Sequence, residues 1–323
     1  AIIAILLHDI GHGPFSHALE HTLVQGIQHE AISLLMMNRL NDEFNGGLTT
    51  AIKMFKGEYP RKFFCQLISG QIDLDRMDYL NRDSFYTGVS EGVISFDRII
   101  KMFNIVDEQL VVEEKGIYSI EKFLVARRLM YWQVYLHKTV IAAEELLVKI
   151  LERAKELSLS GETLFASPAL QHFLKNNVNG QTFFEEENHL QQYAKLDDQD
   201  IYAAIKVWAD NKDAVLSKLC SMLHARKLYK VEISNDKPDA ERVQALSSRT
   251  RAALKINEKD LYYFVFTGAI TNRAYNAESS NVNILMKNGY LLDIAKASDL
   301  SNLKSLDKTV KKHILCYIRE EHI

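Results

Sequence analysis

One stretch near the start of this 323-residue chain decides the fold: Leu7-His8-Asp9-Ile10-Gly11-His12-Gly13-Pro14-Phe15-Ser16-His17. With His21 and His29 it contains five of the chain's 11 histidines. The adjacent His8 and Asp9 offer an imidazole nitrogen and a carboxylate oxygen, which together suit a borderline divalent cation. The glycines let the backbone turn sharply beside a ligand. Although any one of these histidines could be structural, the cluster predicts a functional site.

This run resembles the signature of the HD-domain metal-dependent phosphohydrolases, most of all the branch of the deoxynucleoside triphosphate triphosphohydrolases, which includes the sterile-alpha-motif/HD-domain enzyme. The resemblance implies an HD-domain helical core and one divalent metal ion, which is Mn, Mg, Fe, Zn or Ni. It implies four ligands: an upstream histidine, His8, Asp9 and a distal aspartate. No histidine precedes His8, so we expect residues upstream of Ala1 to supply the first ligand.

The composition is that of a large, soluble globular protein, with 47% hydrophobic residues and a net charge of −3. No global field favours nucleic acid or an anionic membrane surface, and no apolar run reaches the ~18 residues of a membrane span. The apolar residues 1–7 lack the flanks of a signal peptide. Cys65, Cys220 and Cys316 form no CxxC pair and indicate a reducing compartment. We therefore expect a cytoplasmic protein that binds neither membranes nor nucleic acid.

A second motif follows at Asp73-Leu74-Asp75-Arg76-Met77-Asp78-Tyr79-Leu80-Asn81-Arg82-Asp83. Its acids could form a solvated helix face, but Asp75, Tyr79 and Asp83 recur at i, i+4 and i+8, on one stripe that can line a cleft. The segment is similar to the family's distal-Asp motif, which implies Asp75 as a metal ligand. The match also implies that Arg76 contacts substrate phosphate, Tyr79 the sugar and Asp83 the sugar hydroxyl. Arg76 stands where the family often has Lys, and it is the stiffer, bidentate phosphate donor.

A long helix is predicted from about residue 120 to 157. Basic residues on such a helix are usually solvated, but residues 127–138 resemble the family's phosphate- and sugar-binding helix. The match implies that Arg127 faces the triphosphate and that Tyr135 packs on the deoxyribose. Tyr131 stands where the triphosphohydrolases commonly carry His, which leaves the base and sugar preference open.

Histidines of the first motif are candidates for the proton transfer that phosphate-ester hydrolysis needs. A metal at the ligand set would lower the pKa of a bound water and polarise a phosphoryl oxygen, and the leaving oxygen would then need a proton. His12, His17 and His29 can supply it, because imidazole titrates near neutral pH. Glu20 lies at i+3 from His17 and can orient its ring. The family resemblance favours His29, or His17 with Glu20.

Further cations lie outside these motifs: Arg98, His137, Lys138, Arg226 and Lys230. On a continuous helix His137 and Lys138 point about 200° and 300° around from Tyr135, away from its pocket. Surface ion pairs and charge compensation at a helix end are the simple alternatives. The family resemblance instead implies an accessory site for the phosphates of a nucleotide activator, completed between subunits. We therefore expect a homodimer or homotetramer.

The predicted fold class is mostly α, with an HD phosphohydrolase core at residues 1–157, a helical extension at 158–256 and a small α+β C-terminal subdomain at 257–323. Strands are predicted at residues 261–266, 282–286, 290–294 and 313–318. A hairpin is predicted within residues 109–119, turning at 113–116. His172, His189 and His224 are interpreted as isolated structural or surface residues.

Three functions remain open from the sequence. The first is hydrolysis of (deoxy)nucleoside triphosphates to nucleoside and triphosphate. The second is an HD nucleotidase or phosphodiesterase acting on another phosphate ester. The third is a non-catalytic nucleotide-binding oligomer that has lost its first metal ligand. The many basic residues favour the first, because a triphosphate needs several cations, and only the missing upstream histidine favours the third.

Overall fold

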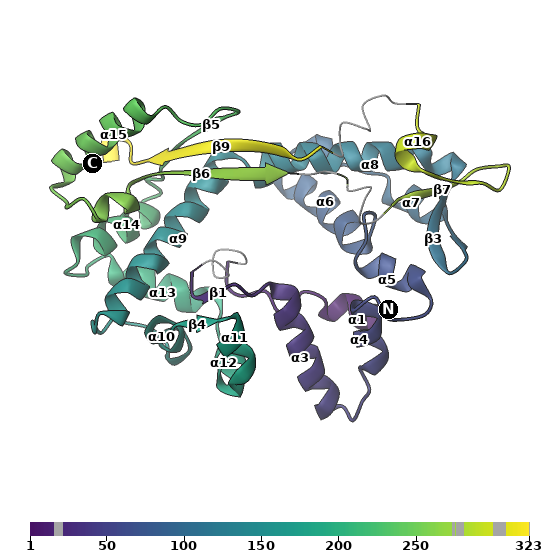
Figure 1. The fold of residues 1–323 in the computed structure, drawn as a ribbon, viewed down its shortest axis with the longest axis horizontal. Coiled ribbons are helices and arrows are strands. Elements are labelled where there is room, and N and C mark those ends of the chain that lie inside the picture. The colour runs from purple at the N-terminus through teal and green to yellow at the C-terminus, as the bar shows by residue number, and fades with distance from the viewer. Residues whose placement is uncertain (16–21, 273–274, 276–280, 300–307, 323) are drawn as a thin grey trace. The chain divides into compact units, whose positions relative to one another are not determined.

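The structure is a computed structural model that describes residues 1–15, 22–272, 275, 281–299 and 308–322. Most of these residues are helical, and a small sheet region lies near the C-terminal end of the chain (Figure 1). The predicted mostly α fold class is confirmed. None of the described helices is long and apolar enough to cross a membrane.

The α-helices are α1 (Ile2–Leu7), α3 (His29–Glu43), α4 (Thr49–Phe55), α5 (Lys62–Ile68), α6 (Leu74–Thr87), α7 (Phe96–Lys101), α8 (Ile117–Met130), α9 (Lys138–Leu159), α10 (Pro168–Lys175), α11 (Gly180–Glu185), α12 (Glu187–Tyr193), α13 (Asp198–Trp208), α14 (Ala214–His224), α15 (Ala240–Leu254) and α16 (Ile294–Ala297). The strands are β1 (Val24–Gln25), β2 (Phe103–Val106), β3 (Gln109–Glu113), β4 (Val178–Asn179), β5 (Lys230–Ser234), β6 (Val265–Asn272), β7 (Asn283–Leu285), β8 (Leu291–Asp293) and β9 (Val310–Tyr317). Short 3₁₀ turns cover Ser90–Gly92, Glu114–Gly116, Asp260–Tyr263 and Glu320–His322, and a π-helical turn covers Tyr131–Tyr135.

The chain divides into two compact units. The first unit comprises Ala1–His8, Met37–His137 and Thr271–Lys311, and the second comprises Asp9–Met36, Lys138–Ile270 and Lys312–Ile323. The three-domain division drawn from the sequence stays a prediction about folding units.

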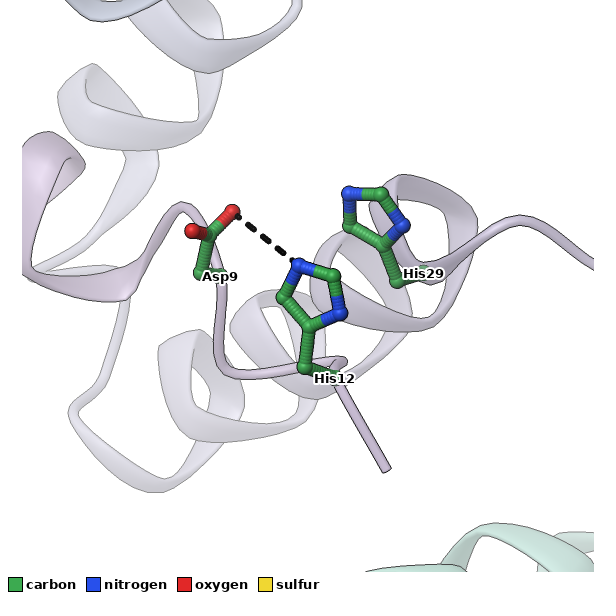
Figure 2. Close-up of side chains that lie close together, drawn as sticks. All are labelled: Asp9, His12 and His29. Carbon is green, nitrogen blue, oxygen red and sulfur yellow. Dashed lines mark ion pairs between the residues drawn. The ribbon is translucent and has the colours of Figure 1, made fainter. Parts of the chain in front are cut away.

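The segment that follows α1 turns back on itself before α3 begins. The His12 amide donates to the Asp9 carbonyl at 3.0 Å, which closes a tight turn. Figure 2 shows this turn beside the first turn of α3, where His29 lies. The segment is held within the second unit, because Lys155 of α9 donates to the Leu23 carbonyl at 3.2 Å and Val24 of β1 pairs with β4.

The strands form small separate sheets. In the first unit the order is β2-β3-β7-β8, with β3 and β7 parallel and the other pairs antiparallel. A three-stranded sheet has the order β5-β9-β6, with β5 antiparallel to β9. The predicted strands near the C-terminus are confirmed, except that residues 260–263 form a 3₁₀ turn and the strand begins only at Val265.

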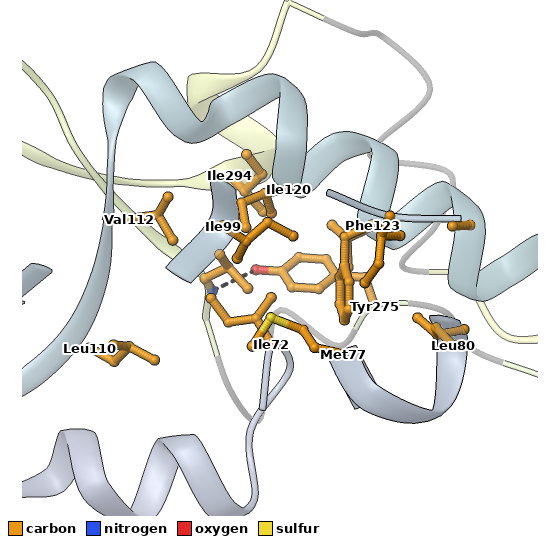
Figure 3. Close-up of a cluster of buried hydrophobic side chains, with 14 of the residues drawn as sticks. Ile72, Met77, Leu80, Ile99, Leu110, Val112, Ile120, Phe123, Tyr275 and Ile294 are labelled. Carbon is orange, nitrogen blue, oxygen red and sulfur yellow. Dashed lines mark hydrogen bonds between the residues drawn. The ribbon is translucent and has the colours of Figure 1, made fainter. Parts of the chain in front are cut away.

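A hydrophobic core holds α6 and α8 in the first unit. Met77 and Leu80 of α6 pack into the same buried cluster as Ile120 and Phe123 of α8. Tyr275 lies in the middle of this cluster (Figure 3), where its hydroxyl accepts a hydrogen bond from the Val282 amide at 3.1 Å. One face of α6 and one face of α8 are therefore buried in this core, and the site residues of the two helices lie outside it.

The ends of α6 follow from its sequence. Asp73 caps the helix by accepting a hydrogen bond from the Arg76 amide at 2.8 Å, which satisfies one of the unpaired donors of the first turn. Gly88 ends the helix in the left-handed conformation, with φ 71°, where glycine costs least. The distal-Asp motif therefore lies on one regular helix, as predicted.

The predicted hairpin was misplaced. Strands β2 and β3 pair from Phe103 opposite Val112 to Val106 opposite Gln109, so the turn is formed by Asp107 and Glu108. Both residues adopt positive φ, 49° and 61°, as a two-residue hairpin turn of the favoured twist requires. Of residues 113–116, which were expected to be the turn, Glu113 ends β3 and the other three form a 3₁₀ turn before α8.

The predicted long helix is also interrupted. The Leu136 amide donates to the Tyr131 carbonyl at 2.7 Å, five residues back, and Leu136 itself leaves helical geometry with φ −103° and ψ 23°. The angular argument that turned His137 and Lys138 away from Tyr135 assumed a continuous helix, and that assumption is wrong. Nothing in residues 130–138 signals the break, since the stretch contains neither Gly nor Pro.

His172 and His189 are not isolated, contrary to the sequence interpretation. His172 Nε2 lies 2.7 Å from His189 Nδ1, and His189 Nε2 lies 3.4 Å from a Glu186 carboxylate oxygen. Burial and the neighbouring His189 lower the pKa of His172, against the opposing effect of Glu186. The pair therefore favours the neutral form of His172.

This pair should make stability fall in mild acid. In the unfolded chain His172 takes up a proton near its ordinary pKa of about 6.5, whereas in the folded protein its pKa is lower. The contribution of His172 to the free energy of unfolding should therefore be complete above pH of about 6.5 and be lost as the pH falls through the lowered folded pKa. His172→Gln should flatten the decrease between pH 7.5 and pH 5, measured by urea unfolding. An unchanged pH dependence in this variant would contradict the assignment.

Candidate active site

His8 and Asp75, two predicted metal ligands, come together in the first unit. His8 Nδ1 lies 2.6 Å from the Ile5 carbonyl oxygen, and Nε2 lies 3.9 Å from an Asp75 carboxylate oxygen. A carbonyl only accepts hydrogen bonds, so Nδ1 donates to Ile5, and Nε2 is the ring nitrogen that faces Asp75. Histidines that bind metals are held in this way by a hydrogen bond from their other ring nitrogen.

Asp9, His12 and His29 form a cluster in the second unit (Figure 2). The rings of His12 and His29 stack with centroids 3.8 Å apart and an interplanar angle of 17°. His12 Nε2 lies 3.9 Å from an Asp9 carboxylate oxygen, and His29 Nε2 lies 3.5 Å from a Glu30 oxygen. One potential ligand atom from each member of the cluster lies within 4.8 Å of the others.

These donors suit a divalent metal ion. Imidazole nitrogens and carboxylate oxygens are the ligand types that Mn, Fe, Zn and Ni accept. The His8–Asp75 pair and its neighbour in the chain, Asp9, offer both types. The residues present therefore fit the predicted cofactor.

The predicted sugar-binding residues meet in the first unit. Tyr135 makes edge contacts with Tyr79, at 6.0 Å between ring centroids, and with Tyr131, at 5.3 Å. The Tyr135 hydroxyl donates to an Asp83 carboxylate oxygen at 2.6 Å. Residues from α6 and from the π-helical turn thus build one aromatic cluster with a carboxylate at its edge.

Two phenols of this cluster, those of Tyr79 and Tyr135, have raised pKa values. Burial raises the pKa of Tyr79 above its ordinary value, and the neighbouring Tyr131 raises it further. Burial also raises the pKa of Tyr135, with the hydrogen bond to Asp83 as the next cause. The Tyr79 hydroxyl can therefore donate a hydrogen bond to a ligand, and the Tyr135 hydroxyl, which donates to Asp83, can accept one.

Arg127 of α8 is a buried cation beside these rings. Its side chain lowers the pKa of Tyr79 through its charge, so the guanidinium lies near that phenol. One nitrogen donates to the Gln71 side chain at 3.4 Å, and within the described residues Nε has no hydrogen-bond partner and no carboxylate pairs with the guanidinium. A buried positive charge in this state is costly unless an anion binds it.

Arg76 is engaged at the start of its own helix. It donates to the Gly70 carbonyl at 2.7 Å and forms an ion pair with the capping residue Asp73. These contacts fix the side chain next to Asp75 in the sequence. Its phosphate contact stays a prediction.

The other predicted residues lie in several places. His17 and Glu20 fall outside the residues that the structure describes. Arg98 of α7 donates to the Lys115 carbonyl at 3.2 Å, and His137 follows the π-helical turn, both in the first unit. The remaining accessory-site residues belong to the second unit: Lys138 begins α9, Arg226 follows α14 with φ 54°, and Lys230 begins β5.

Sequence reasoning missed the residues that hold the first motif in place. Gly11 is hydrogen-bonded to Ser33 of α3 through its amide, at 2.9 Å, and to Tyr193 of α12 through its carbonyl, at 3.0 Å. Tyr193 stands 182 residues away, and no pattern in the sequence marks it.

Comparison with known proteins places the chain in a family. The family model of the HD-associated region matches residues 94–167. The uncharacterized protein YwfO of Bacillus subtilis is 32% identical over 311 residues, covering 92% of this chain and 68% of YwfO. A crystal structure of a phosphohydrolase from Bacteroides thetaiotaomicron is 52% identical, with a TM-score of 0.93 over 98% of this chain and 78% of that one. The chain belongs to the HD-domain phosphohydrolases.

HD-domain phosphohydrolases generally bind a divalent metal, and the paired His8 and Asp75 are consistent with such a site in this member. A more distant relative of this HD-domain phosphohydrolase is named for its substrate. The deoxynucleoside triphosphate triphosphohydrolase SAMHD1 homolog of Dictyostelium discoideum is 31% identical over 153 residues, covering 42% of this chain and 30% of the relative.

Proposed function

We propose that this HD-domain phosphohydrolase hydrolyses (deoxy)nucleoside triphosphates to nucleoside and inorganic triphosphate. The observation that carries the proposal is the buried Arg127, which lies near Tyr79 and has no carboxylate partner within the described residues. A polyphosphate supplies the missing anion, and the tyrosines supply a surface on which a sugar packs. The name of the Dictyostelium relative supports the same substrate class.

In this proposal the nucleotide's sugar lies against Tyr79, Tyr131 and Tyr135, whose ring contacts fix one another. Asp83 already accepts a hydrogen bond from Tyr135, and its free lone pairs can accept one from a sugar hydroxyl. Arg127 neutralises charge on the phosphate chain as it develops during hydrolysis.

His8, Asp9 and Asp75 are proposed to hold the divalent ion. When bound, the ion would lower the pKa of a coordinated water and polarise a phosphoryl oxygen. His12 or His29 is proposed to give a proton to the leaving oxygen of the nucleoside. The two rings are stacked, and a carboxylate lies beside each of them, that of Asp9 beside His12 and that of Glu30 beside His29.

The cations outside the pocket are proposed to bind a nucleotide activator in a homodimer or homotetramer. They are Arg98, His137, Lys138, Arg226 and Lys230. Their shared positive charge supports this assignment, because the phosphates of an activator are anions.

A product assay tests the proposed reaction. The purified protein, supplied with each divalent metal in turn, should convert deoxynucleoside triphosphates to nucleoside and inorganic triphosphate, separated by ion-exchange chromatography. Release of orthophosphate or pyrophosphate, or cleavage only of a monophosphate or a phosphodiester, would favour the alternative HD nucleotidase or phosphodiesterase. Nucleotide binding without any product would favour the non-catalytic oligomer. A second nucleotide added to the same assay should raise turnover if the activator site exists.

A further inference from the structure

The peptide group between Gly11 and His12 is held at both of its polar atoms. The Gly11 carbonyl accepts a hydrogen bond from the Tyr193 hydroxyl at 3.0 Å, and the His12 amide donates to the Asp9 carbonyl at 3.0 Å. The preceding amide, that of Gly11, donates to the Ser33 hydroxyl at 2.9 Å. Since the backbone here is fixed on both sides, the direction in which the His12 side chain leaves it is fixed as well.

Gly11 also lies in direct contact with the start of α3. A Cβ atom at this position would lie 2.3 Å from both the His29 carbonyl oxygen and the Ser33 amide nitrogen. Neither backbone atom can give way without moving α3. The backbone that carries His12 therefore packs without any intervening side chain on the turn that carries His29, and the two rings stack as a result.

Tyr193 is itself a rigid support. Its side chain is 3% exposed, and its ring makes edge contacts with Phe183, at 5.7 Å between centroids, and with Phe173, at 6.2 Å. An aromatic ring packed in this way has few rotamers available. The hydroxyl is thus presented to Gly11 at one position by a helix distant in the sequence.

We propose that Tyr193 is a positioning residue for catalysis, which acts through the Gly11 carbonyl to hold His12 in register with His29. This positioning role rests on the proposed function in one respect, that His12 or His29 gives a proton to the leaving oxygen of the nucleoside. The Tyr193 hydroxyl donates to the backbone of Gly11, so its loss should affect turnover more than substrate affinity.

The simple alternative is that Tyr193 merely stabilises the fold, and the chain offers a matched control for it. Tyr229 is also buried in the second unit, and its hydroxyl donates to a backbone carbonyl, that of Tyr263, at 2.6 Å. Tyr193→Phe and Tyr229→Phe each remove one hydroxyl and one buried hydrogen bond of the same type. Both variants should therefore lower Tm, and only the first should affect the active site.

The experiment compares kcat, KM and the ring-proton NMR signals of His12 in the metal-free protein at one fixed pH. Tyr193→Phe should lower kcat about tenfold, since misplacement of a catalytic group by a fraction of an ångström is costly, with KM within twofold of wild type. It should also shift the His12 signals, while Tyr229→Phe leaves kcat and these signals unchanged.

Two results would overturn the proposal: wild-type kcat in Tyr193→Phe, or an equal loss of kcat in both variants. Failure of the proposed function is distinguishable from these. If the wild-type protein hydrolyses no nucleotide, the His12 signals still decide the positioning. Signals that move only in Tyr193→Phe support it, and signals that do not move in that variant refute it.

Discussion

Asp75→Ala is expected to remove the divalent metal from the protein and to lower turnover by more than about 100-fold. Loss of a residue that only hydrogen-bonds to a metal ligand already lowers metal affinity or activity by up to about 100-fold, and loss of a ligand itself should cost more. Asp75 lies in the first turn of α6, with its carboxylate near His8 Nε2, and the helix keeps its cap at Asp73. Its side chain is 34% exposed, so the substitution opens no cavity in the core. The helical circular dichroism should therefore stay unchanged.

Metal content by inductively coupled plasma mass spectrometry is the decisive measurement. Asp78→Ala is the matched control, because Asp78 lies on the same helix, is exposed and pairs with Arg82. This control should keep both metal and activity. Full metal content in Asp75→Ala would remove Asp75 from the ligand set.

His12→Ala and His29→Ala form the second test, with an expected loss of kcat between about 10² and 10⁴-fold, the range for a positioned general acid or base. The two rings stack at 3.8 Å, so removal of either one also frees the other to move. The losses should consequently be less than additive in the double variant.

Metal content separates this role from ligation. If His12 or His29 is the acid, both variants should retain as much metal as the wild-type protein. Loss of metal would instead identify these histidines as metal ligands, a role that would agree with their closeness to Asp9. His313→Ala, a substitution in β9, should leave turnover and metal content unchanged and controls for general effects of losing a histidine.

The parts of this structure that the sequence predicts are those determined by local chemistry. Asp73 and Gly88 mark the ends of α6 through ordinary capping, and the spacing of the distal-Asp motif on that helix follows at once. The continuous apolar run of residues 314–318 likewise indicates a strand, which β9 confirms. The adjacent His8 and Asp9 are recognisable because they stand in one short run with two glycines and two further histidines.

The parts that could not be predicted depend on conformations or contacts that leave no local mark. Asp107 and Glu108 form a hairpin turn with positive φ although neither is the glycine or asparagine that usually signals one. The π-helical turn at Tyr131–Tyr135 occurs in a stretch that contains neither glycine nor proline to signal it. His172 and His189 meet only because α10 and α12 pack together.

The hydrogen bond between Tyr193 and Gly11 also constrains how the protein is made. It joins residues 182 positions apart, the Phe15 amide reaches Asp198 over 183 positions, and Lys155 reaches Leu23 over 132. Contacts of such long range form late, because a large loop must close before they contribute. In a chain emerging from the ribosome, His12 therefore leaves the ribosome well before Tyr193 does, and its backbone is secured only after α12 has been synthesised.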